Sequence, residues 1–221
     1  MAAKTIGIMS PGDMGHKVGE YAMTLGPKAV TRAVTALDGR SDITRMRAER
    51  AGLIDLGNLA AVADAADIIL CIMAPERAAA FADQAIAAIG GADNPPLYVD
   101  CNAISPLTTQ AIADKFGAAG LPFANVGIIG SPPGGAVPTR FYASGELAPA
   151  LDFLDGDGIS VRQMGSDIVR ASAIKMCYAG LTKGIMTLQT SVLLAGEMLG
   201  IYDELAAEFE ANQNFHWQAM R

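Results

Sequence analysis

Short apolar runs alternate with turns and helical patterns along most of the chain. Such runs occur at residues 6–9, 68–73, 97–99 and 123–129. Each stops at turn-forming residues, and continuous apolar runs of this length are typical of strands buried on both faces of a parallel sheet. The helical patterns between them complete an alternation of strand and helix. The sequence therefore predicts an α/β fold with a doubly wound, mainly parallel sheet.

The pattern changes after residue 165. From Asp167 to about Leu199 no proline occurs, and apolar residues recur with a period of 3.6. A helix of about 33 residues is roughly 50 Å long, too long for one more helix that covers the sheet. We therefore expect a sheet domain over residues 1–165. Residues 166–221 should form a long connecting helix and a small all-α region, with a helix over 202–220.

Two helices alone would expose a broad apolar face. We therefore expect a homodimer that forms through the C-terminal helices. The alternative is that the sequence is a fragment of a longer protein, with Arg221 not the natural C-terminus.

Composition narrows the class of protein. The 221 residues are 51% hydrophobic and 18% charged, which is a globular composition, and the net charge is −7. This negative charge argues against nucleic acid or an anionic membrane as the partner and favours a small-molecule substrate. The three cysteines show no paired spacing, and neither a signal peptide nor a membrane span is evident. We expect a cytoplasmic protein with reduced thiols and no metal site.

The first strand ends in a glycine turn. The dinucleotide fingerprint G-x-G-x-x-G is met as Ser10-x-Gly12-x-x-Gly15, with serine at the position of the first glycine. The second glycine lets the backbone approach phosphates, and the third lets the helix pack on the strand. We expect the backbone at Gly12, Asp13 and Met14 to hold a pyrophosphate. The alternative is a strand–turn–helix that binds nothing.

The next turn bears on the choice of cofactor. Arg40 and Ser41 follow the second predicted strand, where a dinucleotide site meets the adenosine ribose. Arginine there accommodates the 2′-phosphate of NADP, whereas an acidic residue such as Asp38 would favour NAD. We expect NADP as cofactor, with NAD possible. A solvated turn over residues 38–40 is the alternative.

Two further residues could carry chemistry. Asn102 follows a predicted strand, at the edge of an α/β sheet where ligands bind, and its amide suits a carboxylate or hydroxyl. The alternative is a turn residue before a helix that Ser105 caps. Lys175 lies on the long helix among apolar residues, with no acidic residue four positions away. Burial would lower its pKa and let it exchange protons near neutral pH, although a lysine that reaches solvent fits the same pattern.

Together these motifs resemble the β-hydroxyacid dehydrogenase family, which includes 3-hydroxyisobutyrate dehydrogenase and the cofactor domain of 6-phosphogluconate dehydrogenase. The glycine turn matches the family's G-x-G-x-M-G from its third position on. Asp100, Asn102 and Pro106 match D-x-S-T-x-x-P in outline. Gly130-Ser131 loosely matches the glycine-rich substrate loop, and Lys175 matches the lysine early in the long helix.

The resemblance implies an NAD(P)-dependent dehydrogenase that acts on a small hydroxyacid or related alcohol. Lys175 would then be the general acid and base. The substrate would be oriented by Asn102, Gly130 and Ser131, and the nicotinamide ribose would be bordered by Met73 and Ala74.

Departures from the family pattern leave the substrate open. Asn102-Ala103 replaces Ser-Thr, and Tyr178-Ala179 replaces an asparagine pair, which points to a less characterised subgroup. An imine reductase is one alternative, although Lys175 counts against it. A cofactor-binding protein without dehydrogenase activity is another. The motifs also leave the reaction direction and pathway open.

Overall fold

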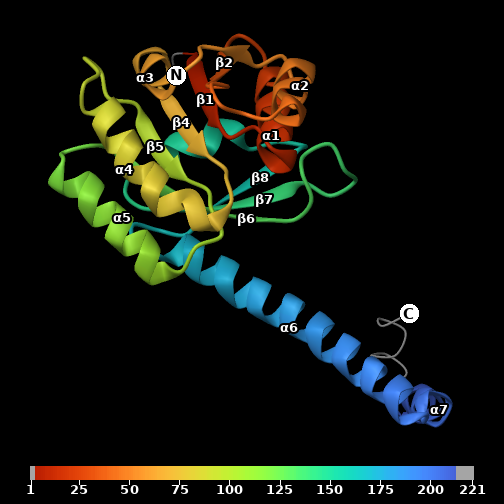
Figure 1. Cartoon of the computed structure of the whole chain (residues 1–221). Helices are drawn as coiled ribbons and strands as arrows, with labels where there is room; N and C mark the ends of the chain where they lie inside the picture. Colours follow the sequence, from red (N-terminus) through yellow and green to blue (C-terminus); the bar gives the residue numbers. More distant parts are fainter. Residues whose placement is uncertain (1–2, 213–221) are drawn as a thin grey trace. The chain divides into compact units, whose positions relative to one another are not determined.

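The computed structural model describes residues 3–212 and divides into two compact units, Met1–Met176 and Cys177–Arg221. The first unit contains one eight-stranded sheet in the order β3-β2-β1-β4-β5-β6-β7-β8. Helices cover both faces of this sheet (Figure 1), which confirms the predicted doubly wound α/β fold of the Rossmann type. The units meet within a long helix, whereas the boundary predicted after residue 165 lies before that helix begins.

Six neighbouring strands are parallel, and the last two complete the sheet at one edge. The strands are β1 (Lys4–Met9), β2 (Val30–Thr35), β3 (Ile54–Asp55), β4 (Ile68–Cys71), β5 (Leu97–Asp100), β6 (Phe123–Ile129), β7 (Thr139–Ser144) and β8 (Ile159–Gln163). Strand β7 runs antiparallel to β6, and β8 runs parallel to β7. The order along the chain reverses between β1 and β4, so the crevice at their carboxyl ends is the expected ligand position.

The helices fall into two sets. The helical segments are α1 (Asp13–Thr24), α2 (Asp42–Arg50), α3 (Leu59–Ala65), η1 (Pro75–Arg77), α4 (Ala78–Ile89), α5 (Pro106–Ala118), η2 (Ala148–Leu154), α6 (Arg170–Leu199) and α7 (Tyr202–Asn212). Buried side chains of α1, α2 and η2 share one core with the sheet, and those of α3, α4 and α5 share the other. The sheet is therefore buried on both faces, as the continuous apolar runs predicted.

Local signals explain most helix starts. Ser105 accepts a hydrogen bond from the backbone N–H of Thr108 at 3.1 Å, with Pro106 as the first helical residue, which confirms the predicted cap. The long helix begins at Arg170 rather than at Asp167, because the preceding residues form a turn in which Arg170 N–H donates to the carbonyl of Asp167. The segment η2, Ala148–Leu154, is a 3₁₀ helix with proline in its first turn.

The second unit holds most of α6 together with α7. The two helices pack at Gly196, where an added Cβ would lie 3.0 Å from Leu205. Helix α7 is described over Tyr202–Asn212. The helix was predicted over 202–220, and residues 213–220 of that prediction lie outside the described residues. Within residues 3–212, no helix combines the length and apolarity that crossing a membrane requires.

In the first unit, the start of α6 lies in direct contact with β6. A Cβ added at Gly127 would lie 2.3 Å from the carbonyl oxygen of Ala171 and 3.1 Å from Cβ of Lys175. Only glycine permits this approach without a shift of backbone. The contact fixes the position from which the Lys175 side chain extends.

Buried polar side chains tie the same helix start to three other elements. Asn125 of β6 donates through Nδ2 to the carbonyl of Ile168 and to the hydroxyl of Ser172, each at 2.9 Å. Ser144 of β7 donates to the Ile168 carbonyl at 2.8 Å, and the hydroxyls of Thr109 and Ser172 lie 2.7 Å apart. Each buried polar group is thereby satisfied, and the first turn of α6 is held against β6, β7 and α5.

Replacing Gly127 with alanine is expected to destabilise the fold by about 1–3 kcal/mol, because the new methyl group must displace the backbone of α6. Urea unfolding followed by circular dichroism measures this. The matched control is Gly117→Ala in α5, where an added Cβ meets nothing within 4 Å. That control should be neutral or stabilising by up to about 1 kcal/mol. Equal stabilities of the two variants would contradict the close contact.

Candidate functional site

The turns that follow the parallel strands bring most of the predicted site residues to one edge of the sheet. Strands β1, β2, β4, β5 and β6 run parallel, so their carboxyl ends point the same way. The turns after them carry the glycine motif, Arg40-Ser41, Met73-Ala74, Asn102 and Gly130-Ser131. Residues spread over more than half of the sequence thus lie at one edge of the sheet.

The glycine turn keeps the expected shape despite its serine. Ser10 adopts φ +60°, in the left-handed region, and its carbonyl accepts a hydrogen bond from Gly12 N–H at 2.6 Å. An added Cβ at Gly15 would lie 3.0 Å from the Ser10 carbonyl, so the third glycine permits close packing. Serine therefore adopts here the left-handed conformation that glycine adopts without strain.

Helix α1 begins without a side-chain cap. Gly12 is the N-cap residue, and no side chain accepts a hydrogen bond from the first-turn N–H groups. Asp13 is exposed and lies 3.6 Å from Arg47, while Met14 is half-buried. Uncapped N–H groups at a helix N-terminus, together with the helix dipole, can bind an anion such as a phosphate.

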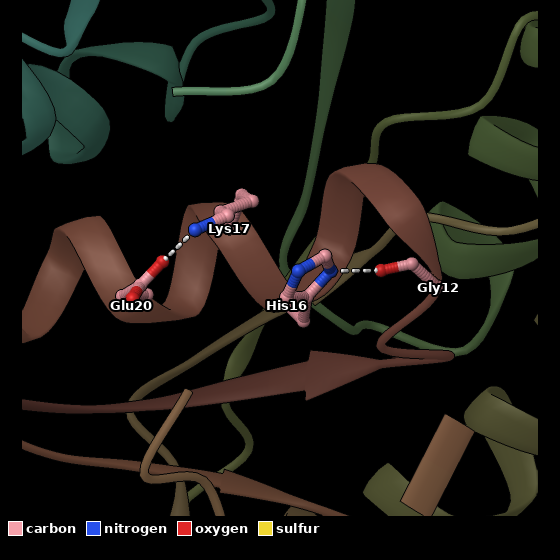
Figure 2. Close-up of polar contacts among 4 residues, drawn as sticks. All are labelled: Gly12, His16, Lys17 and Glu20. Carbon is pink, nitrogen blue, oxygen red and sulfur yellow. Dashed lines mark hydrogen bonds and ion pairs between the residues drawn. The ribbon is translucent and has the colours of Figure 1, made fainter. Parts of the chain in front are cut away.

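A buried histidine supports this helix start, and sequence reasoning did not assign it a role. His16 Nδ1 lies 2.6 Å from the carbonyl oxygen of Gly12 (Figure 2). A carbonyl only accepts, so Nδ1 carries the hydrogen, and the side chain is 7% exposed. On the next residue, Lys17 pairs with Glu20 at 2.6 Å along the helix (Figure 2). The imidazole therefore restrains the cap carbonyl from inside the protein.

Arg40 and Met73 line one cavity of about 300 Å³. The other residues that line it are Glu76, Arg77, Ala80, Phe81 and Gln84. Ser41 instead caps α2, since its hydroxyl accepts from Thr44 N–H at 3.4 Å, and the exposed Ala74 precedes η1. The structure therefore places Met73 and Arg40 along one cavity, and the expectation that Met73 and Ala74 border the nicotinamide ribose stays a prediction.

Asn102 is held inside the protein. Its Oδ1 accepts from Met73 N–H at 2.7 Å, and its Nδ2 donates to Asp100 Oδ2 at 3.1 Å. Its own N–H donates to Asp100 Oδ1 at 2.9 Å, and the residue is only 2% exposed. The side-chain amide of Asn102 thus joins the turns after β4 and β5. In this structure it points into the protein and not toward the crevice.

Burial controls the ionisable groups around Asn102. It raises the pKa of Asp100 to about 6, although the two N–H groups of Asn102 favour the carboxylate. It also raises the pKa of the Cys71 thiol to about 12, with the nearby Asp100 adding to the rise. Cys101 is likewise buried, and its pKa is raised for the same reason. Both thiols stay protonated at neutral pH and are poor nucleophiles.

The loop after β6 closes on itself. Gly130 has φ +118°, a conformation that favours glycine, and Ser131 is exposed. Thr139 donates its hydroxyl hydrogen to the Ser131 carbonyl at 2.6 Å, which joins the two ends of the loop. Next along β7, Arg140 extends toward the loop. Its Nη2 lies 3.9 Å from where a Cβ at Gly130 would be.

Lys175 lies against β6, the strand that leads into this loop. It is half-buried, and its Cβ lies against Gly127, in the strand that leads to Gly130. The structure thereby brings the predicted proton-transfer residue and the predicted substrate loop to one strand. Within residues 3–212, no group of three or more histidine, cysteine or acidic side chains is arranged to hold a metal ion.

Comparison with known sequences gives one distant relative. No protein-family model matches the chain. A curated protein of Methanothermus fervidus, described as an uncharacterized 28.5 kDa protein in 7S RNA 5′ region, is 27% identical over 199 residues. The alignment covers 88% of this chain and 74% of the relative.

Solved structures match more extensively. A conserved protein of unknown function with structural similarity to 3-hydroxyacid dehydrogenases has a TM-score of 0.71 and 25% identity, over 97% of this chain and 78% of its own. Mycobacterium tuberculosis 3-hydroxyisobutyrate dehydrogenase, solved with L-serine, has a TM-score of 0.67 and 16% identity, over 95% and 70%. The imine reductase of Myxococcus stipitatus, solved with NADP⁺, has a TM-score of 0.70 and 18% identity, over 97% and 73%.

These neighbours share the fold of the chain over nearly its whole length. The chain has the fold of the 3-hydroxyacid dehydrogenase-like proteins, which confirms its resemblance to a less characterised subgroup of the β-hydroxyacid dehydrogenase family.

Proposed function

We propose that this protein is an NADP-preferring oxidoreductase that transfers hydride between a nicotinamide cofactor and a small hydroxyacid or related alcohol. One observation carries the proposal. Lys175 lies against Gly127 of β6, and β6 leads into the Gly130 loop at the edge where α1 begins uncapped. The proposal is also supported by the fold that the chain shares with dehydrogenase-like proteins.

The residues at this edge fit a dinucleotide. The first-turn N–H groups of α1 would hold the pyrophosphate, with Ser10, Gly12 and Gly15 shaping the turn. Arg40 and Arg77 supply two cations in one cavity, which would favour the 2′-phosphate of NADP. We assign Met73 to this adenosine half, because it shares that cavity with Arg40. Solved imine reductase complexes with NAD⁺ and NADP⁺ support a nicotinamide cofactor.

Lys175 would move the proton. The cofactor, when bound, supplies the hydride acceptor or donor. During oxidation, the neutral amine of Lys175 accepts the proton of the substrate hydroxyl, and during reduction the ammonium returns it. Backbone groups at Gly130 and Ser131 would orient the substrate, while Asn102 keeps the neighbouring turns in register. An imine substrate is the alternative, because imine reductases share the fold.

Replacing Arg40 with glutamine is expected to weaken NADPH binding roughly 10- to 100-fold, because a charge-assisted contact to the 2′-phosphate is lost. NADH binding should change less than about 3-fold, since NADH has no such phosphate. Fluorescence titration with both cofactors measures this. The control is Arg50→Gln, an exposed arginine on α2. Equal losses for both cofactors would count against an NADP phosphate site at Arg40.

Replacing Lys175 with alanine is expected to lower turnover by a factor of ~10²–10⁴ while cofactor affinity changes little. A panel of short hydroxyacids, alcohols and imines, followed through NADPH absorbance, identifies the substrate and then measures kcat. Lys183→Ala, an exposed lysine on the same helix, is the control. Unaltered turnover in the Lys175 variant would remove this lysine from the mechanism.

We also propose that a second copy of the chain covers the apolar side chains of the second unit. Leu181, Met186 and Leu188 are each 66% exposed, and Met198 is 86% exposed. Such exposure of large apolar side chains along one helical segment marks an interaction surface. In an isologous contact with a second copy, the same apolar surface is buried on both chains.

Light scattering at micromolar concentration is expected to give twice the mass of the chain. Leu188→Glu should shift the population toward monomer, because a carboxylate would be buried in the contact. Glu208→Gln, an exposed change on α7, serves as the control. A well-behaved monomer for the unaltered chain would contradict the homodimer.

A further inference from the structure

The face of the sheet that receives α6 also carries two basic side chains. In the register of β6 and β7, Gly127 lies opposite Tyr142, and Ile129 lies opposite Arg140. Phe141, between the two, is in the core shared with α1 and η2. Successive side chains of a strand alternate between faces, so Tyr142 and Arg140 share the opposite face with Lys175.

The second basic residue belongs to the neighbouring strand. Arg162 of β8 pairs with Tyr142, and its guanidinium carbon lies 6.0 Å from the centre of the tyrosine ring. Arg162 is exposed, whereas Arg140 and Tyr142 are half-buried. Arg140, Arg162 and Lys175 therefore lie on one face of the sheet, in a chain whose net charge is −7.

Arg140 lies beside the predicted substrate loop. Strand β7 runs antiparallel to β6, so its first residues, and not its last, lie at the carboxyl edge of the parallel strands. Arg140 Nη2 lies 3.9 Å from the Cβ position of Gly130, and no carboxylate among residues 3–212 forms an ion pair with it. A half-buried guanidinium that pairs with no carboxylate in this described part of the chain is suited to bind an anion through two parallel N–H groups.

Asn102 stands at the motif position that the family resemblance assigns to substrate binding, but its amide is bonded inside the protein. Asn102 directs both its amide oxygen and its amide nitrogen into the protein, toward Met73 and Asp100. Removing it from those bonds would leave buried polar groups without partners, which costs about 1–3 kcal/mol for each group. An anionic substrate therefore needs another partner at this edge.

We propose that Arg140 binds the anionic group of the substrate, a carboxylate or a phosphate, beside the Gly130-Ser131 loop. Lys175 contacts the strand at Gly127, two residues before Ile129, the residue opposite Arg140. Two residues along a strand span roughly 7 Å, so the anionic group and the reacting hydroxyl belong to a short molecule. The role of the hydroxyl rests on the proposed function, whereas the anion contact does not.

Calorimetric titration of the full chain tests this, with and without NADP⁺. The probes are 3-hydroxypropionate, its neutral methyl ester, glycerol 3-phosphate and inorganic phosphate. We expect one class of anion to bind saturably, and Arg140→Gln to weaken it roughly 10- to 100-fold, as for a lost charge-assisted hydrogen bond. Arg140→Lys should retain part of the affinity. The ester should bind wild type and Arg140→Gln alike.

The control variant is Arg162→Gln, which removes an exposed cation from the same face and should change affinity less than about 3-fold. Circular dichroism establishes that each variant is folded. The class that binds, carboxylate or phosphate, identifies the substrate group. The proposal is overturned if neither class binds the wild type, or if Arg140→Gln binds the anions as tightly as the wild type.

The same titrations separate this proposal from the proposed function. Arg140-dependent anion binding without any NADP⁺ binding or turnover would support the anion site and contradict the oxidoreductase. NADP⁺-dependent turnover that is insensitive to Arg140→Gln in both KM and kcat would support the oxidoreductase and contradict the anion site.

Discussion

The contact between Gly127 and the start of α6 is the constraint on which the candidate site depends. A single side-chain carbon at this glycine would overlap the Ala171 carbonyl, so β6 and α6 can approach this closely only because residue 127 is glycine. Asn125, Ser144 and Ser172 then satisfy the polar groups that this contact buries. The helix cannot slide along the strand without breaking these bonds together, because they share donors and acceptors: Asn125 donates to both Ile168 and Ser172, and the Ile168 carbonyl also accepts from Ser144. A loose helix–sheet contact could not hold a lysine at a defined position.

Charge is distributed unevenly over this acidic chain. Three arginines, Arg40, Arg77 and Arg140, lie near turns at the edge where the parallel strands end. The one deeply buried carboxyl beside these turns, Asp100, is held by Asn102, and its pKa is raised toward neutrality by burial. These arginines bring positive charge to the edge of the sheet, where Glu76 and Asp13 are also present, while the molecule as a whole is negative. That contrast suits anionic ligands and disfavours anionic polymers.

The sequence allowed prediction of the parts that follow local rules. Apolar runs located β1, β4, β5 and β6, and the serine–proline pair located the start of α5, because burial and capping are encoded by neighbouring residues. The two-residue β3 escaped prediction, since it is too short to show any period.

The directions of the side chains at the edge of the sheet could not be predicted from neighbouring residues in the sequence. The inward turn of Asn102 depends on Met73, 29 residues away, and the placement of Arg140 depends on the antiparallel direction of β7. Both follow from strand order and not from the residues themselves. Arg140 stands between Thr139 and Phe141, and an arginine beside an apolar residue in a predicted strand reads from sequence only as the solvent face of that strand.

Ser10 in the glycine turn has a consequence for the entropy of ligand binding. A serine at φ +60° pays a steric cost of roughly 1–2 kcal/mol that glycine would not, and the chain meets that cost once, during folding. In return, the serine has fewer backbone conformations open to it than glycine does. A turn with less freedom before binding has less freedom to lose on binding. The missing glycine thus exchanges some stability of the protein for a turn that is already ordered when its ligand arrives.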